Sequence, residues 1–320
     1  MTQFQNLLVG VDFEHGGPLG SGHLSPVVDD TVRTATWLAE IAKAPLTFFT
    51  AVDFPLDSRD MDLAVDDPRH LPRALVESAQ DALAQLVRGA QAKGISAQAE
   101  VDLGKGWIEI IRHVLAHRHD LVIVGTRNLH GIERLLLGGT SRRLMRNCPS
   151  AVWVVRPNPA PSVSNILVAS DLHAESEKAL RAASALASLT GAKVHLVHAI
   201  DYPLDRLWFR HIDARTENYH HRLLSAAHRT LEQQVAKLGA AGATVEVEVV
   251  DGTRGADLAI LRYIEAQQID LLVMGTVGRG GLAGVFIGNT AERLAQQAPC
   301  SILAVKADDF QCPVALGPSA

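Results

Sequence analysis

Short apolar runs alternate with longer amphipathic stretches along the chain, and the second half shows this most clearly. The apolar runs have the length of strands, and leucines and alanines recur at helical spacing in the stretches between them. Runs such as residues 271–274 lack the polar alternation of a half-exposed strand, so they predict a parallel sheet covered by helices on both faces. In the second half, the expected strands are 166–170, 193–200, 244–250, 271–274 and 301–305, and the expected helices are 175–189, 219–238, 257–267 and 289–297.

Three blocks of sequence occur twice in the same order, which indicates an internal duplication. The repeated blocks are 6–12 with 165–171, 120–126 with 270–276, and 147–156 with 297–306. A proline-rich stretch between the two copies has the composition of a linker. The expected parts are a first domain over residues 1–157, a second domain over residues 158–308 and a C-terminal tail over residues 309–320.

Composition and charge narrow the class of protein. The chain is 47% hydrophobic and 20% charged, with a formal net charge of −5. This composition is typical of a globular protein, and the acidic balance gives no general attraction for nucleic acid or anionic lipid. Three cysteines favour a reducing compartment, and neither a signal-peptide pattern nor a membrane-spanning apolar run is found. We therefore expect a cytoplasmic protein without nucleic-acid or membrane partners.

Glycines are concentrated between the fourth expected strand of the second half and the helix that follows it. Gly275, Gly278 and Gly288 punctuate this stretch, which ends at Asn289 and Thr290. Glycines let main-chain N–H groups converge on an anion, and a helix start offers free N–H groups and a positive dipole end. We expect Asn289 or Thr290 to cap the helix. Spacing alone fits a tight turn before a capped helix equally well, and no GxxxxGK[ST] loop occurs.

The pattern Gly275-x2-Gly278-x9-Gly288 resembles the nucleotide loop of the universal stress protein family, Gly-x2-Gly-x9-Gly-Ser/Thr. The strands that lead to Asp12 and Asp171, and the closing strand of each half, are similar to the same family. The layout resembles its tandem, two-domain members. The resemblance implies two Rossmann-like (adenine nucleotide alpha hydrolase-like) α/β domains. Each would have a five-stranded parallel sheet of order 3-2-1-4-5 with helices on both faces.

The resemblance also implies a ligand, ATP or AMP, with Mg²⁺ accompanying ATP. The aspartate after the first strand would face the adenine, and the main chain after the second strand would contribute. Carried over residue by residue, these roles fall on Asp171, Ile200, Gly275, Gly278, Arg279, Gly288, Asn289 and Thr290. Asn289 stands where the family has Ser or Thr, which weakens the case for phosphate binding.

The first half departs further from the family pattern. Asn128 replaces the second glycine, and Gly139 replaces the residue with the hydroxyl group. Asparagine tolerates a left-handed backbone, but its side chain would intrude on a close phosphate. We therefore expect the second domain to hold the nucleotide. The weaker candidates in the first half are Asp12, Gly125, Gly138 and Thr140.

Several other polar residues have an ordinary structural interpretation beside a functional one. Asp12 and Asp171 can cap helices as well as bind a base or ribose. The 14 histidines form no HExxH motif, so no structural metal is expected. His117 and His119 are expected at a helix end, where cationic side chains suit the dipole. Basic residues crowd the first glycine stretch and its helix, where they either pair with acidic groups of the other half or hold an anion: Arg127, Arg134, Arg142, Arg143 and Arg146.

The expected function is that of a stress-response protein that binds an adenine nucleotide in its second domain. The two domains are expected to form an internal pseudo-dimer through their last strands, residues 152–155 and 301–305, because edge strands need partners. A homodimer is a further alternative. The rival functions are slow ATP hydrolysis and a nucleotide-free protein that binds another small or apolar ligand. The SGGxDS and HxGH signatures of related nucleotide enzymes are absent from the sequence.

Overall fold

The computed structural model describes residues 4–13, 25–53, 71–126, 137–157, 161–202, 214–238, 243–276 and 288–316. The chain divides into two compact units. The first contains Met1–Pro161 together with Gln311–Ala320, and the second contains Ser162–Phe310. The end of the chain therefore belongs to the first unit, where the Cys312 thiol donates a hydrogen bond to the Asn147 carbonyl oxygen at 3.4 Å.

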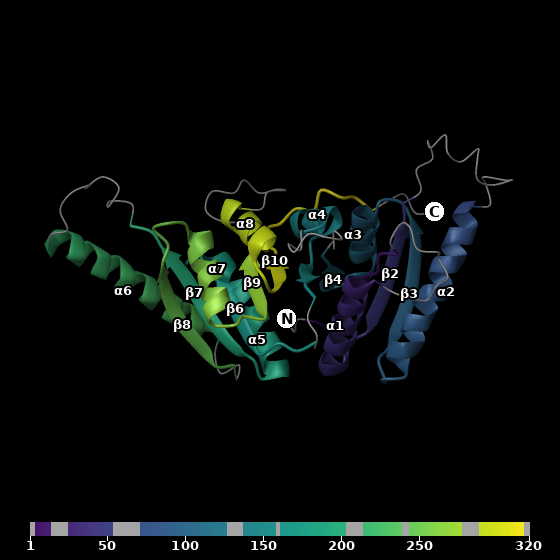
Figure 1. Ribbon diagram of the computed structural model, residues 1–320, viewed down its shortest axis with the longest axis horizontal. Helices are drawn as coiled ribbons and strands as arrows, with labels where there is room; N and C mark the ends of the chain where they lie inside the picture. The colour runs from purple at the N-terminus through teal and green to yellow at the C-terminus, as the bar shows by residue number, and fades with distance from the viewer. Residues whose placement is uncertain are drawn as a thin grey trace. The chain divides into compact units, whose positions relative to one another are not determined.

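The first unit alternates strands and helices in chain order (Figure 1). Its elements are β1 (Leu7–Gly10), α1 (Pro26–Ala42), β2 (Leu46–Val52), α2 (Leu71–Gln91), β3 (Ala97–Leu103), α3 (Gly106–His117), β4 (Leu121–Gly125), α4 (Gly139–Asn147) and β5 (Ala151–Val155). All neighbouring strands of this unit pair in parallel, in the order β3-β2-β1-β4-β5.

The second unit repeats this arrangement. Its elements are β6 (Asn165–Ala169), α5 (Ala174–Thr190), β7 (Lys193–Ile200), α6 (Ala214–Lys237), β8 (Val245–Asp251), α7 (Ala256–Ala266), β9 (Leu271–Gly275), α8 (Asn289–Gln297) and β10 (Ser301–Val305). The parallel order is β8-β7-β6-β9-β10. The predicted fold class is confirmed: each unit has the order 3-2-1-4-5, with helices on both faces (Figure 1). Pairing of the last strands across the units stays a prediction.

Burial follows the position of each strand in its sheet. The central strands are apolar and almost completely buried, as in Leu121–Gly125 and Leu271–Gly275. The outer strands β3 and β8 alternate between exposed and partly buried residues, because they have a neighbour on one side within their unit. Exposed carboxylates on these strands, including Glu100 and Glu246, discourage pairing with a further chain.

The same aspartate contact occurs at the amino-terminal edge of the sheet in both units, as the sequence repeat predicts. In the first unit, the Asp120 carboxylate accepts hydrogen bonds from the N–H groups of Gln5 (2.6 Å) and Asn6 (3.1 Å). In the second, one oxygen of Asp270 accepts from the N–H groups of Ser164 (2.8 Å), just before β6, and of Asn165 (2.9 Å), its first residue. The aspartate before the fourth strand thus fixes the start of the first strand in both units.

Candidate functional site

The carboxyl ends of the strands in the second unit bring most of the predicted residues to one edge of the sheet. Asp171 follows β6, Ile200 ends β7 and Gly275 ends β9. The start of α8 supplies Gly288, Asn289 and Thr290. Gly278 and Arg279 lie outside the described residues. Ligands of open parallel sheets bind at this edge, near the point where the strand order reverses.

Asp171 forms a tight local structure before α5. Its Oδ1 accepts hydrogen bonds from the His173 N–H (3.1 Å) and the Ser176 hydroxyl (2.6 Å), and its own N–H donates to Ser176 Oγ (3.1 Å). Leu172 adopts a left-handed backbone (φ 67°) within this turn. The carboxylate is therefore fixed in position at the sheet edge, while Oδ2 takes part in none of these three bonds.

A buried polar network supports this turn, and the sequence did not reveal it. The Ser170 hydroxyl donates to Gln234 Oε1 on α6 (3.2 Å), and Gln234 Nε2 donates to the His173 carbonyl (3.1 Å). His198 Nδ1 lies 2.8 Å from the Ser170 carbonyl oxygen. These residues tie β6, β7 and α6 together directly behind Asp171. Gln234 is far from the motif in sequence and carries no signal of its own.

The backbone of Ile200 is packed closely against the turn that follows β8. The Ile200 carbonyl accepts a hydrogen bond from the Gly252 N–H at 2.7 Å. A Cβ at Gly252 would lie 2.9 Å from the same oxygen, so only glycine fits there. Next to this turn, hydrogen bonds from the Thr253 N–H and hydroxyl hold the pKa of Asp251 below its usual range, which keeps a negative charge at the edge. Tyr202 and His220 form an aromatic pair just beyond β7, with ring centroids 4.0 Å apart.

Helix α8 begins without a side-chain cap. The prediction that Asn289 or Thr290 caps it is wrong, because the N-cap residue is Gly288 and Asn289 is already the first helical residue. The Gly288 carbonyl accepts the Glu292 N–H at 2.9 Å, and the Gly288 N–H donates to the Thr276 carbonyl at 3.0 Å. The first turn of α8 thus receives no hydrogen bond from an N-cap side chain, and it presents the positive end of the helix dipole.

A buried hydroxyl lies beside this helix start. Thr276, which follows β9, is 1% exposed, and its Oγ1 has no hydrogen-bond partner among the described residues. Thr126 is the equivalent residue after β4, and its Oγ1 is also buried and without a partner there. A buried hydroxyl that lacks a partner is unusual, because it loses its hydrogen bonds to water. The residues are identical in the two repeats, which is the sequence signal that could have identified them.

The carboxyl edge of the first unit has a similar helix start. Gly138 is the N-cap of α4 and has no side-chain cap, and Thr140 is exposed in the first turn. Asp12 is exposed after β1. Gly125 has a packing role instead, because a Cβ there would lie 2.7 Å from Thr31 Oγ1 on α1.

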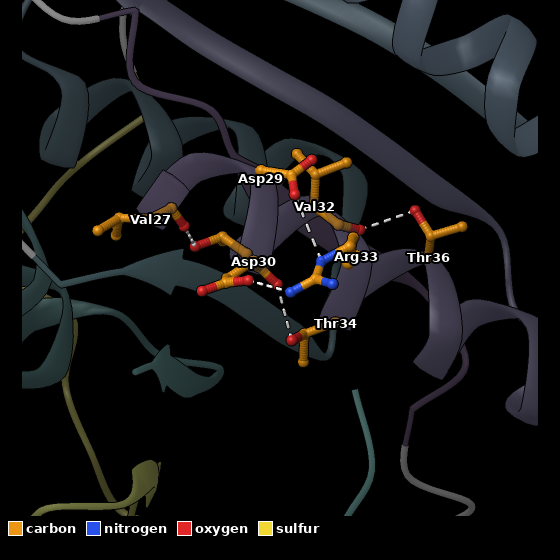
Figure 2. Close-up of polar contacts among 8 residues, drawn as sticks. Val27, Asp29, Asp30, Val32, Arg33, Thr34 and Thr36 are labelled. Carbon is orange, nitrogen blue, oxygen red and sulfur yellow. Dashed lines mark hydrogen bonds and ion pairs between the residues drawn. The ribbon is translucent and has the colours of Figure 1, made fainter. Parts of the chain in front are cut away.

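Helix α1 packs against Gly125 with its hydroxyl groups satisfied internally. Thr31, Thr34 and Thr36 each donate a hydrogen bond to the carbonyl oxygen four residues earlier, at 2.7–2.8 Å. Figure 2 shows these bonds along the helix, together with the ion pairs that Arg33 forms with Asp29 (3.4 Å) and Asp30. The helix can therefore bury threonine without leaving its hydroxyl unpaired.

One arginine position differs between the units in what it contacts. In the first unit, the guanidinium of Arg143 lies 5.8 Å from the centre of the Trp107 ring. At the equivalent positions of the second unit, Arg293 lies 3.4 Å from the carboxylate of the buried Asp257. Both contacts join the helix after the third strand to the helix after the fourth. Within the described residues, no group of three His, Cys, Asp or Glu side chains could hold a metal ion, and no helix is long and apolar enough to cross a membrane.

A duplicated open sheet of order 3-2-1-4-5, with an uncapped helix start at its carboxyl edge, belongs to the Rossmann-like class of α/β proteins. Residues 3–156 and 163–306 each match the model of the universal stress protein family, and the chain therefore belongs to that family.

Individual relatives agree with this assignment. Universal stress protein E of Salmonella typhi is 31% identical over 216 residues, covering 65% of this chain and 67% of that protein. A universal stress protein of Mycolicibacterium smegmatis is 25% identical and covers 94% of this chain and 96% of its own length. The crystal structure of a universal stress protein from Archaeoglobus fulgidus has a TM-score of 0.66 at 18% identity. The match covers 94% of this chain and 98% of that one, and it shows the shared fold.

Proposed function

We propose that this protein binds ATP or AMP at the carboxyl edge of its second unit and acts in the stress response as a cytoplasmic binding or regulatory protein. The observation that carries the proposal is the start of α8. Its N-cap is a glycine, which offers no side-chain hydrogen bond, and next to it lies the buried Thr276 hydroxyl, which has no hydrogen-bond partner among the described residues. Free N–H groups and a positive dipole end at a helix start favour a phosphate group.

The remaining candidate residues have complementary roles in this proposal. Asp171 would use its second carboxylate oxygen for the adenine or ribose edge, since Oδ1 is already engaged by His173 and Ser176. The main chain at Ile200 would contribute to base recognition. The phosphate groups, with Mg²⁺ in the case of ATP, would be bound by the loop and helix start, represented by Gly275, Gly278, Arg279, Gly288, Asn289 and Thr290.

The second unit is the better candidate because of the sequence of its loop. The first unit has Asn128 where the second has Gly278, and Gly139 where the second has Asn289. A side chain at the position of Asn128 would occupy the path of the phosphate groups. The proposal therefore assigns one nucleotide to each chain.

Paired substitutions test this assignment. Gly278→Val places a branched side chain in the proposed phosphate path, whereas Asn128→Val makes the equivalent change in the first unit. Isothermal titration with ATP and AMP should show a loss of binding of at least about tenfold for Gly278→Val, which corresponds to about 1.4 kcal/mol. Asn128→Val should bind as the unchanged protein does. Circular dichroism confirms that both variants are folded.

Unchanged affinity in Gly278→Val would remove this loop from the proposed site. If neither nucleotide binds the unchanged protein and a different small molecule is released from it on denaturation, the nucleotide-free alternative is correct. Linear release of phosphate under saturating ATP would instead support slow hydrolysis.

A further inference from the structure

Three histidines lie close together where α3 ends and β4 begins, at the amino-terminal edge of the sheet of the first unit. His113 and His117 are one turn apart on α3, and their rings are stacked with centroids 4.2 Å apart. His119 lies just before β4, and its ring stacks on His113 at 5.1 Å. The prediction that His119 serves as a cationic residue at the helix end is wrong, because the side chain is directed into the protein and is 3% exposed.

The two buried rings are joined directly to each other. His113 Nδ1 and His119 Nε2 lie 3.1 Å apart, and His113 is 7% exposed. One nitrogen must donate and the other must accept, so the two rings cannot both be imidazolium ions while this bond exists. The other ring nitrogens, His113 Nε2 and His119 Nδ1, are buried without hydrogen-bond partners among the described residues. Phe49 on β2 lies against His113 with ring centroids 5.1 Å apart.

The groups around His113 and His119 provide little stabilisation for a positive charge on either ring. His117 adds a third ring that repels a proton on either of the others, and α4, which packs on α3, carries Arg142, Arg143 and Arg146. The Asp120 carboxylate next to His119 is engaged by the N–H groups of Gln5 and Asn6.

Charged residues elsewhere on α3 and its C-cap do not change this balance. Glu109 is paired with Arg112 (2.8 Å), and the C-cap residue Arg118 adds a positive charge. Neither β2 nor β5 contains an ionisable residue. Burial first, and the neighbouring imidazoles second, lower the pKa of His113 and of His119 to about 4, while the backbone of Asn6 opposes the shift at His119.

We propose that His113, His117 and His119 form an acid-sensitive junction that loosens the α3–β4 end of the first unit when the pH falls below about 6. Protonation of either ring would place charge in an apolar site, and protonation of both would break the bond between them. The junction also fixes neighbouring segments, since Asn6 Nδ2 donates to the His117 carbonyl at 3.0 Å and Ser150 Oγ donates to the His119 carbonyl. Its loosening would therefore release the start of β1 and the turn before β5.

The direction of the effect follows from linkage. The folded pKa of about 4 lies below the unfolded value of 6.5, so this stability is fully present above pH 6.5 and is lost as the pH falls towards 4. A single histidine with these two pKa values lowers the folding equilibrium constant about twentyfold between pH 7 and pH 5. Burial raises the pKa of Asp120, which acts in the opposite direction and offsets part of the loss at the acid end.

The second unit provides an internal comparison. Counted back from Gly275, the equivalent residues are Tyr263, Gln267 and Ile269. One buried histidine, His195, lies nearby with Nδ1 3.0 Å from the Tyr263 hydroxyl, and burial lowers its pKa. The fold therefore does not require the cluster of three histidines. We expect the acid response of the second unit to be weaker.

Hydrogen exchange of the full chain at pH 7.5 and 5.0, corrected for intrinsic rates, tests the proposal. Peptides covering residues 106–121 should lose protection at least about tenfold at pH 5.0, and peptides covering residues 256–271 should lose less. The double variant His113→Tyr/His119→Ile, which introduces the residues of the second unit, should abolish the loss. The exposed His221→Gln control should retain it.

An equal loss of protection in the double variant, or in both units, would overturn the proposal. A second measurement does not depend on the variant being folded. NMR titration of the histidine ring protons in the unchanged protein should give midpoints clearly below 6.5 for the histidines assigned to positions 113 and 119, and midpoints near about 6.5 for both would overturn the proposal.

Discussion

Gly125 lies at the last position of β4, where α1 approaches so closely that no side chain fits. A Cβ would lie 2.7 Å from Thr31 Oγ1 and 2.9 Å from Val27 Cγ1. Both neighbours are β-branched residues in a helix, so they have little freedom to move aside. Resemblance to the family suggested a nucleotide role for Gly125, whereas its contacts give it a packing role in the first unit.

The substitution Gly125→Ala should therefore destabilise the protein by about 1–3 kcal/mol, because the added methyl group overpacks the junction of α1 and β4. Gly89→Ala is the matched control, since a Cβ at Gly89 in α2 would meet nothing within 4 Å. It should stabilise the protein by about 0.5–1 kcal/mol through helix propensity. Urea denaturation measures both, and a neutral Gly125→Ala would show that α1 can shift away from β4 without cost.

Individual side chains show where sequence reasoning reaches its limit. The position of Asp171 at the carboxyl edge follows from the strand before it, but its expected capping role does not hold, because the N-cap of α5 is His173. Gly288 could not be predicted as the N-cap of α8, because Asn289 is the better cap by propensity and the local geometry shifts the helix start by one residue. The histidine cluster was missed because the helix ends between His117 and His119, so no single periodicity connects the three residues.

At the scale of secondary-structure elements, equivalent positions of the two units contact each other but carry different side chains. The helix after the third strand contacts the helix after the fourth in both units. Trp107 and Arg143 make this contact in the first unit, and Asp257 and Arg293 make it in the second. The Arg293 side chain is 58% exposed, so salt should weaken its ion pair with Asp257. Salt should weaken the contact between Arg143 and the Trp107 ring less.

Double-mutant cycles should separate the two contacts. Coupling between Arg293→Ala and Asp257→Asn is expected to be at most about 1 kcal/mol and to fall in 1 M salt, where the Debye length is about 3 Å. Coupling between Arg143→Ala and Trp107→Ala is expected to be about 0.5–1 kcal/mol and to change less with salt. Denaturation of the full chain at low and high salt gives both values. Equal salt dependence would contradict the assignment.

The pattern of apolar residues was sufficient to predict most elements of the second unit. The expected ranges 193–200, 289–297 and 301–305 agree with β7, α8 and β10 as found. Helix α6 begins at Ala214, five residues before the expected 219, because its first turn lacks the apolar spacing that marks an amphipathic helix. The order of strands came from the family resemblance, since hydrophobic pattern alone does not determine which strands are neighbours.

At the scale of the whole molecule, two units with one architecture have come to differ at opposite edges of their sheets. The second unit retains the glycine spacing at the carboxyl edge, together with the fixed Asp171 carboxylate and the uncapped start of α8. The first unit has only part of that spacing and contains the histidine cluster at its amino edge. Duplication allows such specialisation, because each unit has its own hydrophobic core.

The most direct test of the nucleotide proposal is the stoichiometry of nucleotide on the full chain. The purified protein is saturated with ATP or AMP and freed of unbound ligand. It is then denatured, and the released small molecules are identified and quantified by mass spectrometry. One adenine nucleotide per chain is the predicted result. Two per chain would contradict the assignment to the second unit, and none, together with no binding of either nucleotide in equilibrium dialysis, would contradict the proposed function itself.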